Sequence, residues 1–554
     1  MTIDLVILNG RLWTMDEARP RAEALAISAG RIVKLGRTAD MKALKGRKTK
    51  VIDAGGATVL PGFIEAHLHV FGGGAETASL DLQGVSGIEE LRARLTVFAA
   101  ANCESKIIIG NQANYTILGG GEALTRRHLD RIVPQRPVLL YAPDYHTAWA
   151  NSKALELAGI LKGRALPPGH EIVMGADGFA TGELREPLAI GPVADLATEF
   201  RRSRLGLSTG GEPEPYPSPK DFAFDLDIIH GALKRCAAFG ITSFHNMDGN
   251  LYTLELLAAL EREGELLARA RVPFHFKPFM PVAALERAST MAKAYTSPLL
   301  SSGLVKMFMD GVIDSGTAVL REDYADKPGW RGDPLFTQAQ FSEVATEADR
   351  RGLQIAVHAI GDGAVHMVLD GYEAARRSNG TRDSRHRIEH IEVVDPSDIA
   401  RFRKLGVIAS MQPPHPPGSQ GLPLEPTLGK IGKARLPYAY AWNRFRKAKV
   451  PLVFGTDWPV SDLNPMRSIH SAVTRKAWDE SVDAQRQTLQ QAIHSYTVMG
   501  AYAEFAESRK GILKKGALGD VVVLDRDLGS CDPEDLQNVK PQATVMGGRV
   551  VFEN

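Results

Sequence analysis

Cysteine is scarce in this sequence of 554 residues: only Cys103, Cys236 and Cys531 occur, and no two of them have C-x-x-C spacing. So odd and sparse a set excludes a disulfide framework and a thiolate zinc site, and it is typical of a reducing compartment. No run approaches 18 apolar residues, and the first residues, MTIDLVILNG, lack the basic start and apolar stretch of a secretory signal. We therefore expect a cytoplasmic protein with no membrane partner.

An excess of charge of either sign is also missing. Lysine plus arginine number 66 and aspartate plus glutamate 65. This balance creates no overall field that would attract nucleic acid or an anionic membrane. The content of apolar residues, 44%, and of charged residues, 24%, is that of an ordinary globular protein with a large core. The expected partner is a small molecule.

Short apolar runs separated by turn residues occupy both ends of the chain. The pattern predicts hairpins rather than β-α-β units. We expect the two ends to pair into one small β-domain made of residues 1–57 and 510–554. The predicted strand regions are 4–15, 23–36 and 50–60 near the N-terminus, and 519–527 and 543–554 near the C-terminus.

Eight further apolar runs, each followed by a polar or helical stretch, lie between these ends. This alternation predicts an α/β fold, a (β/α)8 TIM-like barrel with parallel buried strands. Helical periodicity at 251–270 and 341–351 fills two of the gaps. The barrel is assigned to residues 58–75 and 226–509, with strands at 58–69, 240–247, 272–280, 303–311, 353–360, 386–393, 406–413 and 450–457.

The gap between the first and second barrel strands is too long for one helix. It contains strand-like runs at 106–112 and 136–143 and a hairpin-like piece at 167–183. The segment 208–221, STGGEPEPYPSPKD, is rich in Pro, Gly and Ser and marks a flexible return to the barrel. We expect residues 76–225 to form an inserted α+β lobe over the barrel mouth.

Titratable residues gather where the predicted barrel strands end, which is where a barrel carries its chemistry. His67 and His69 end strand 1, and residues two apart on a strand face the same side, so both can point to one metal ion. Imidazoles with a carboxylate suit zinc, iron or manganese. The full set is His67, His69, Lys306, His358, His390 and Asp457.

Each of these residues also has a structural explanation when taken alone. An isolated H-x-H is more often structural than a site, His358 or His390 could be a core histidine, and Asp457 could cap the following helix. Lys306 could extend to the surface. The joint pattern favours a metal site, because all six fall on the strands of one barrel.

Lys306 points to two metals rather than one. Burial and nearby metal cations would favour the neutral amine. A neutral lysine amine can add CO2 and form a carbamate, whose two oxygens could bridge two metals about 3.5–4 Å apart.

The chain resembles the amidohydrolase superfamily, and within it the YtcJ-like, amidohydrolase-3 branch that includes N-substituted formamide deformylases. The stretches that carry the resemblance span nearly the whole chain in the family's order: LPGFIEAHLH, HTAWANSKAL, LVKMFMDG, LQIAVHAIGDGA, HRIEHIE, ASMQPPHP, FGTDWPV and GDVVVLD. One departure is the segment after Asp310, GVIDSGTAVL, where relatives often carry a serine- and arginine-bearing loop.

The resemblance implies roles for the six residues. His67 and His69 would bind one metal, and His358 and His390 the other. Lys306 would be the carboxylated bridge, and Asp457 a ligand that also acts as the proton-shuttling base. It further implies a β-sandwich formed by the two termini and a homodimer. Two divalent metals per chain, zinc by preference, are the expected cofactors.

The hypothesis that follows is hydrolysis of a non-peptide C–N (amide) bond of a small molecule, such as an N-substituted formamide, by a metal-activated water with Asp457 as the base. Two alternatives stay open: a hydrolytic deaminase of a nitrogen heterocycle with one metal, and a non-catalytic regulatory or binding protein of the same fold. Substrate contacts are expected from the mouth loops: Tyr145, His146, Trp149, Asn151, Gln412, His415 and Trp458.

Overall fold

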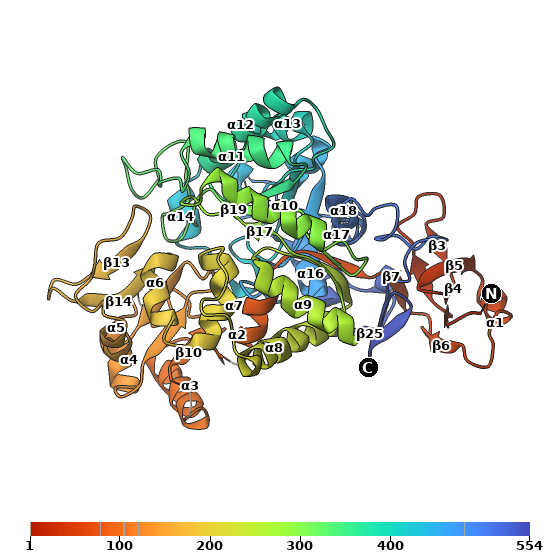
Figure 1. Cartoon of the computed structure of the whole chain (residues 1–554), viewed down its shortest axis with the longest axis horizontal. Coiled ribbons are helices and arrows are strands. Elements are labelled where there is room, and N and C mark those ends of the chain that lie inside the picture. The colour runs from red at the N-terminus through yellow and green to blue at the C-terminus, as the bar shows by residue number, and fades with distance from the viewer. Residues whose placement is uncertain (1, 78, 104–105, 120, 481) are drawn as a thin grey trace.

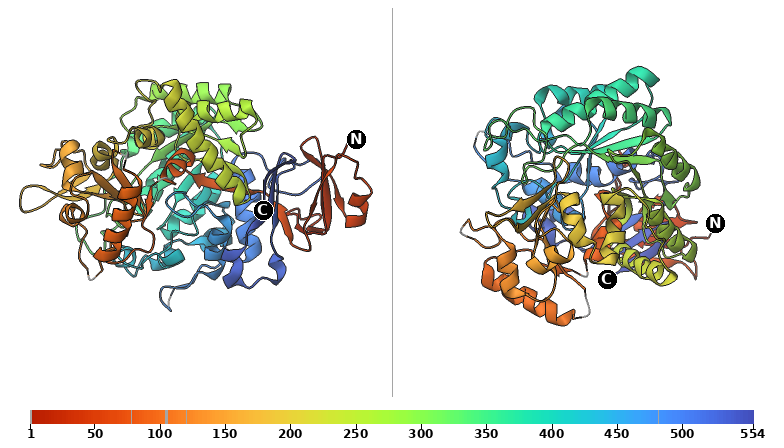
Figure 2. Two further views of the ribbon diagram at one scale, coloured as in Figure 1. Left: turned by 90° about the horizontal axis from the view of Figure 1, so that it is seen from below. Right: turned by 60° about the vertical axis from the view of Figure 1, so that its left-hand side comes forward.

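The computed structural model describes residues 2–77, 79–103, 106–119, 121–480 and 482–554. Two sheets built from the chain ends lie at one end of the molecule, and a lobe of strands and short helices lies at the other (Figure 1). A ring of strands and helices stands between them. The same order is seen from below in Figure 2.

The terminal sheets pack against each other as a sandwich. One has the strand order β5-β4-β1-β6 and the other β26-β25-β24-β7-β2-β3. Their shared apolar core takes Leu5 and Ile27 from the first sheet and Val59, Val521 and Val545 from the second. The strands are β1 (Leu5–Leu8), β4 (Ala24–Ser28), β5 (Arg31–Gly36) and β6 (Lys50–Asp53) in the first sheet, and β2 (Arg11–Trp13), β3 (Arg21–Ala22), β7 (Thr58–Pro61), β24 (Val521–Leu524), β25 (Pro541–Met546) and β26 (Arg549–Glu553) in the second.

Parallel strands form the central ring at each of the eight predicted places, and two of the eight are broken into two segments. They pair in the orders β18-β16-β15-β8 and β17-β19-β20-β21-β22-β23. The ends of the series meet where the Asp457 amide donates to the His67 carbonyl (2.7 Å) and the His69 amide to the Trp458 carbonyl (2.8 Å). The strands are β8 (Phe63–Leu68), β15 (Ile241–Asn246), β16 (Arg269–Arg271), β17 (Phe274–His275), β18 (Leu300–Ser301), β19 (Leu304–Phe308), β20 (Gln354–Ala359), β21 (Arg387–His390), β22 (Ile408–Met411) and β23 (Leu452–Phe454).

Helices cover the outside of the ring, in the places that the apolar periodicity indicates. α9, for example, buries Leu254, Leu257 and Leu260 on one apolar face. The helices between and after the strands are α2 (Val70–Glu76), α8 (Pro219–Ala238), α9 (Leu251–Glu263), α10 (Leu285–Ala294), α11 (Gln338–Arg350), α12 (Asp362–Asn379), α13 (Pro396–Leu405), α14 (Thr427–Ile431), α15 (Trp442–Lys447), α16 (Pro465–Thr474), α17 (Leu489–Tyr496) and α18 (Val498–Ala503).

Two sequence predictions need correction. The run 58–69 is not one barrel strand: β7 ends at Pro61 in the terminal sandwich, and β8 begins at Phe63. Gly62 lies between them so close to Thr242 that a Cβ there would stand 2.2 Å from the threonine hydroxyl oxygen. The helix predicted over 251–270 ends at Glu263, because Gly264 adopts a left-handed conformation (φ 75°) that stops it.

The region between β8 and β15 forms a separate six-stranded sheet, with the order β13-β14-β12-β11-β10-β9. The hairpin-like piece is present as antiparallel β13 and β14. Two apolar clusters, one on each side of the sheet, fill this lobe. Its strands are β9 (Leu80–Asp81), β10 (Ile108–Asn111), β11 (Val138–Tyr141), β12 (Thr147–Ala150), β13 (Glu171–Met174) and β14 (Ala180–Arg185), and its helices α3 (Ile88–Ala101), α4 (Arg126–Ile132), α5 (Ser152–Leu157), α6 (Pro187–Ala194) and α7 (Thr198–Ser208).

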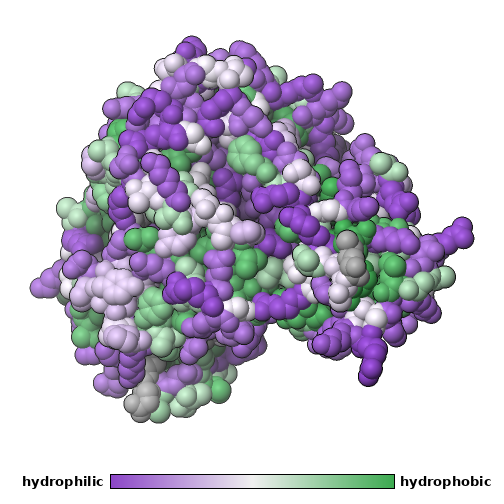
Figure 3. All heavy atoms as spheres, turned by 45° about the vertical axis from the view of Figure 1, so that its right-hand side comes forward, coloured by the Kyte–Doolittle hydropathy of each residue, from purple (hydrophilic) through white to green (hydrophobic). Residues whose placement is uncertain are grey.

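The surface and the thiols match the composition. Hydrophilic residues cover most of the face seen in Figure 3, with apolar residues interspersed. Cys103 is exposed, Cys236 is buried and Cys531 is partly buried, and no disulfide joins these three residues. Among the described residues, no helix combines the length and apolar character needed to cross a membrane.

Candidate functional site

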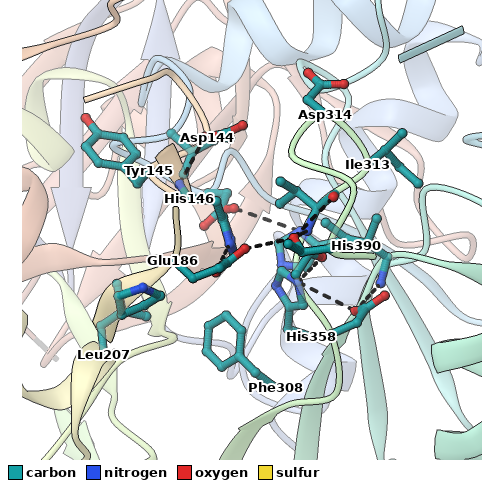
Figure 4. A pocket seen from close by; sticks show the side chains of 18 of the residues that line it. Asp144, Tyr145, His146, Glu186, Leu207, Phe308, Ile313, Asp314, His358 and His390 are labelled. Atoms are coloured by element: carbon teal, nitrogen blue, oxygen red, sulfur yellow. Dashed lines mark hydrogen bonds and ion pairs between the residues drawn. The ribbon is translucent and has the colours of Figure 1, made fainter. Parts of the chain in front are cut away.

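A cavity of about 600 Å³ opens at the carboxyl ends of the barrel strands, under the inserted lobe. The barrel contributes the inner wall and the lobe the outer wall. In Figure 4, His146 and Glu186 from the lobe face His358 and His390 from the barrel. The residues of the wall that carry the argument below are His67, His69, His358, His390, His415 and Asp457 from the barrel, and Asp144, Tyr145, His146 and Glu186 from the lobe.

His67, His69 and Asp457 form the inner corner of this cavity. One carboxylate oxygen of Asp457, Oδ1, lies 3.1 Å from Nε2 of His69 and 3.3 Å from Nε2 of His67. The three residues are buried, and one ligand atom of each lies within 4.8 Å of the others. His67 lies on β8 and His69 directly after it, and both share one site with Asp457, which follows β23. Their spacing in the sequence predicted this grouping.

Several buried polar atoms here have no hydrogen-bond partner. They are Nε2 of His67, Nδ1 of His69 and Nζ of Lys306. Leaving such atoms unpaired costs about 1–3 kcal/mol each, unless a bound group satisfies them. Two imidazole nitrogens beside a carboxylate are donors that fit a divalent metal ion. The residues present therefore fit the metal that the sequence predicts.

Lys306 lies on β19 with its ammonium group fully buried. Burial lowers the pKa of Lys306 to about 8, and nearby Glu389 and Asp457 oppose the shift. Its Nζ stands 4.6 Å from the centre of the Phe308 ring. A lysine in this position has a substantial fraction of neutral amine near pH 8, as a carbamate-forming lysine requires.

Two histidines predicted to bind the second metal lie beside each other. The ring centres of His358 and His390 are 4.5 Å apart, and those of His67 and His390 are 4.8 Å apart. Nε2 of His358 lies 3.0 Å from the Gly311 carbonyl, which can only accept, so the proton is on Nε2 and the lone pair is on Nδ1. His415 is a second neighbour of His390: His390, His415 and Asp457 also bring ligand atoms within 4.8 Å of one another.

Asp457 and His390 adopt left-handed backbone conformations, with φ of 60° and 75°. Such conformations are uncommon in residues other than glycine. They cluster at functional sites, where the surrounding structure holds the backbone in place. The Asp457 carboxylate is buried, which raises its pKa, but the neighbouring histidines, His67 foremost, hold that pKa well below its usual range. Asp457 is therefore an anion facing the histidines.

The lobe contributes an imidazole–carboxylate pair to the outer wall. Nδ1 of His146 lies 2.8 Å from Glu186 Oε2, and Thr317 donates to Glu186 Oε1 (2.8 Å). Burial opposes protonation of His146, yet Glu186 and Asp144 raise its pKa to about 9. Tyr145 donates to the buried Glu76, which also pairs with Arg204. The cavity thus presents an imidazolium near the predicted metal ligands.

Of the other expected substrate contacts, only His415 and Tyr145 join His146 in the cavity wall. Asn151 instead caps α5 and binds main-chain groups of β11 and its neighbours. Trp149 packs in the lobe core against Tyr115. Gln412 lies behind His390, at 3.0 Å from its Nδ1, and Trp458 packs on Gly73. These four side chains take part in packing and hydrogen bonds outside the cavity and do not line its wall.

Sequence reasoning missed three carboxylates that contact site residues. Glu389 lies 2.7 Å from His67 Nδ1, Asp248 lies 3.6 Å from His69 Nδ1, and Glu186 binds His146. Glu389 stands in the stretch HRIEHIE, where strand alternation places it on the face of Arg387. That alternation was the available signal. Glu186 and Asp248 lie just after the ends of β14 and β15, and their partners are distant in sequence.

Comparison with known proteins identifies the family. The chain is 31% identical to Protein LONG AFTER FAR-RED 3 of Arabidopsis thaliana over 99% of this chain and 91% of that protein. It is 28% identical to the putative amidohydrolase YtcJ of Bacillus subtilis (98% of each chain) and 24% identical to the N-substituted formamide deformylase of Arthrobacter pascens (99% and 98%).

The fold is also found among solved structures. An uncharacterized metal-dependent hydrolase from Pyrococcus furiosus matches with a TM-score of 0.70 and 28% identity, covering 96% of this chain and 99% of that one. The model of the amidohydrolase family Amidohydro_3 matches residues 50–552, which include both histidines of the β8 corner, Lys306 and Asp457. This chain belongs to the amidohydrolase family.

Proposed function

We propose that the protein is a metal-dependent hydrolase that cleaves the C–N bond of a small non-peptide amide, with N-substituted formamides as the first substrates to test. The observation that carries the proposal is the group of buried, unpartnered nitrogens of His67, His69 and Lys306 beside the Asp457 carboxylate. The relative named as an N-substituted formamide deformylase supports the choice of substrate class.

The proposed ligands divide into two sets. His67 and His69 would hold one divalent ion, and His358 and His390 the other, with Asp457 between them. When bound, the metal lowers the pKa of water towards neutrality and polarises the substrate carbonyl. His415 lies within reach of the same Asp457 oxygen as His390, at 3.9 Å, and is the alternative ligand of the second set.

Asp457 is proposed to move the proton. As an anion inside the cavity, it accepts a proton from the attacking water at a carboxylate oxygen and returns it to the leaving nitrogen. His146, with its raised pKa and its partner Glu186, would donate a hydrogen bond to the substrate from the outer wall. Tyr145 and His415 complete the proposed contacts.

Lys306 is proposed to carry a carbamate. Its neutral amine nitrogen would form a bond to the carbon of CO2, lose one proton and become an anion with two oxygens. The product suits the site because its charge and oxygens replace a buried amine that has no hydrogen-bond partner. A carbamate would bridge the two sets of ligands.

The test is a panel assay on purified protein loaded with zinc. We expect about two metals per chain by elemental analysis, and amine release from formamides and small acyl amides. Release of ammonia from nitrogen heterocycles by protein with one metal would indicate the deaminase instead. A protein that takes up no zinc on loading and turns over none of these compounds would favour the non-catalytic alternative and overturn the proposal.

A further inference from the structure

Glu389 is a fully buried carboxylate that joins a metal-site histidine to an arginine in the barrel interior. Its Oε2 lies 2.7 Å from Nδ1 of His67. On the other side, Arg387 donates from Nε to Oε1 (2.8 Å) and from Nη2 to Oε2 (3.0 Å). Neither Glu389 nor Arg387 was predicted from the sequence to take part in the site, and neither is one of the six predicted ligands.

The charges of this trio determine where the protons are. A guanidinium has donors only, so both Glu389 oxygens accept from Arg387 and the carboxylate is ionised. A carboxylate in turn can only accept, so the hydrogen of His67 sits on Nδ1. The lone pair of His67 is therefore on Nε2, the atom that faces Asp457 and has no partner.

Further buried groups hold Arg387 in place. Its Nη2 donates to the Ala66 carbonyl (2.8 Å) and to Ser410 (2.9 Å), and its Nη1 donates to Nδ1 of His245 (2.8 Å). Nε2 of His245 then faces Glu504 at 3.4 Å, and Lys510 pairs with Glu504 at 2.6 Å. A polar column thus runs through the barrel interior and ends at His67.

The other buried glutamate near His67 serves as a contrast. Glu65 accepts at Oε1 from the main-chain amides of His67 (3.2 Å) and Thr456 (2.8 Å), and its Oε2 has no hydrogen-bond partner. Glu65 therefore fixes the backbone of the two strand ends. Of these two glutamates, only Glu389 has the position to fix the ring.

We propose that Glu389, held by Arg387, is a positioning residue that sets the tautomer and ring orientation of His67 and thereby the affinity of the site for its metal. The inference rests on the proposed metal site. Carboxylates that accept from the distal nitrogen of a metal-binding histidine make that ligand more basic, and their loss typically weakens metal binding 10–100-fold.

The experiment compares the zinc affinity of the wild type with that of Glu389→Gln by competition with a chromophoric chelator. A glutamine at 389 has one accepting oxygen and one donating nitrogen, so its NH2 would oppose either Arg387 or the Nδ1 hydrogen of His67. We expect zinc to bind about 10–100-fold more weakly. Glu389→Asp keeps the anion but shortens its reach, and we expect an intermediate loss.

Asp349→Asn is the matched control. Asp349 is also buried, and it also binds one histidine, His386, and one arginine, Arg382, away from the cavity. We expect this variant to be less stable than the wild type but to bind zinc with unchanged affinity. Thermal unfolding of all metal-free variants reports folding separately from metal binding.

Two results would overturn the proposal: zinc affinity of Glu389→Gln within twofold of the wild type, or an equal loss in Asp349→Asn, which would mark a general effect of destabilisation. Should Glu389→Gln fail to fold, Glu389→Asp decides by the same measure. Amide turnover is assayed in parallel. A wild type that binds zinc but hydrolyses no amide contradicts the proposed function and leaves the positioning of His67 standing.

Discussion

Two buried pairs of aspartate and histidine show opposite kinds of hydrogen bonding. At the start of β21, His386 accepts at Nδ1 from the Ile355 amide (3.1 Å) and meets Asp349 at Nε2 (3.1 Å). Asp349 is further bound by Arg382 and Asn379. At the cavity, Asp457 meets His69 at a similar 3.1 Å, but Nδ1 of His69 has no hydrogen-bond partner, although the atom is buried.

The difference separates residues that stabilise the fold from residues that await a ligand. Folding selects buried polar groups whose hydrogen bonds are complete, because an unpaired buried group is costly. The pair of Asp349 and His386 is complete and needs nothing further. The cluster of Asp457, His67 and His69 is incomplete within the protein, and such local conflicts are expected at functional sites.

The largest expected effect is on turnover, from Asp457→Asn. The amide side chain cannot accept the proton of the attacking water, so kcat should fall about 10²–10⁴-fold. Metal content should be largely kept, because the histidines remain. Steady-state kinetics and elemental analysis on the same preparation measure both. Asp349→Asn is the control and should keep kcat; an unchanged kcat in Asp457→Asn would remove Asp457 from the mechanism.

Removing the metal should lower the stability of the protein through the cluster of Asp457, His67 and His69, and not through the pair of Asp349 and His386. A ligand that binds only the folded state stabilises it by about 4 kcal/mol when present at 1,000 times its Kd. We expect chelation to lower the Tm and abolish activity, and added zinc to restore both. The zinc-dependent part of the Tm shift should be smaller in His67→Ala and of full size in Asp349→Asn. A shift of equal size in His67→Ala would place the stabilising metal elsewhere.

Lys306→Met tests the buried amine. Methionine has a similar length and no charge, so it should remove the bridging carbamate without leaving a cavity. We expect about one metal per chain in place of two, and a kcat at least tenfold lower. A carbamate at a site that binds two metals adds the mass of one CO2, about 44 Da, to the protein. Intact-mass measurement under native conditions should find this labile mass on the wild type and not on the variant. Two metals in Lys306→Met would argue against the bridge.

Some features of the site could be predicted from the sequence and others could not. His67 and His69 could be assigned to one site because side chains two apart share a face, and Asp457 because strand ends of a barrel converge. The division between β7 and β8 could not be foreseen, because it depends on the contact of Gly62 with Thr242 across the fold. Hydrophobic pattern gives the elements, but not which sheet a strand joins.

Side-chain partnership was the property that the sequence concealed. Asn151 and Trp149 stand in a motif typical of the family, yet one caps a helix and the other fills the lobe core. Glu389 lies between Arg387 and His390 in the sequence, but the sequence pattern did not indicate its role. In each case the role depends on a partner that is distant in the chain, which composition and periodicity do not specify.

The smallest effect should come from the complete pair, and it should appear in stability alone. Breaking a buried pair by removing one charge costs about 3 kcal/mol, so Asp349→Asn should unfold at lower urea concentration with kcat kept. Burial raises the pKa of Asp349, but hydrogen bonds from His386 and Asn379 overcome this and lower it from 3.8 to about 2. A pKa lowered by folding stabilises the protein above the unfolded value, and that contribution is lost as the pH falls from about 4 to 2. Urea unfolding at several pH values should therefore find the wild type losing stability more steeply than Asp349→Asn in this range. If the stability of the two proteins fell equally with pH, the partners of Asp349 would not lower its pKa. The contrast with Asp457 would then rest on hydrogen bonding without charge.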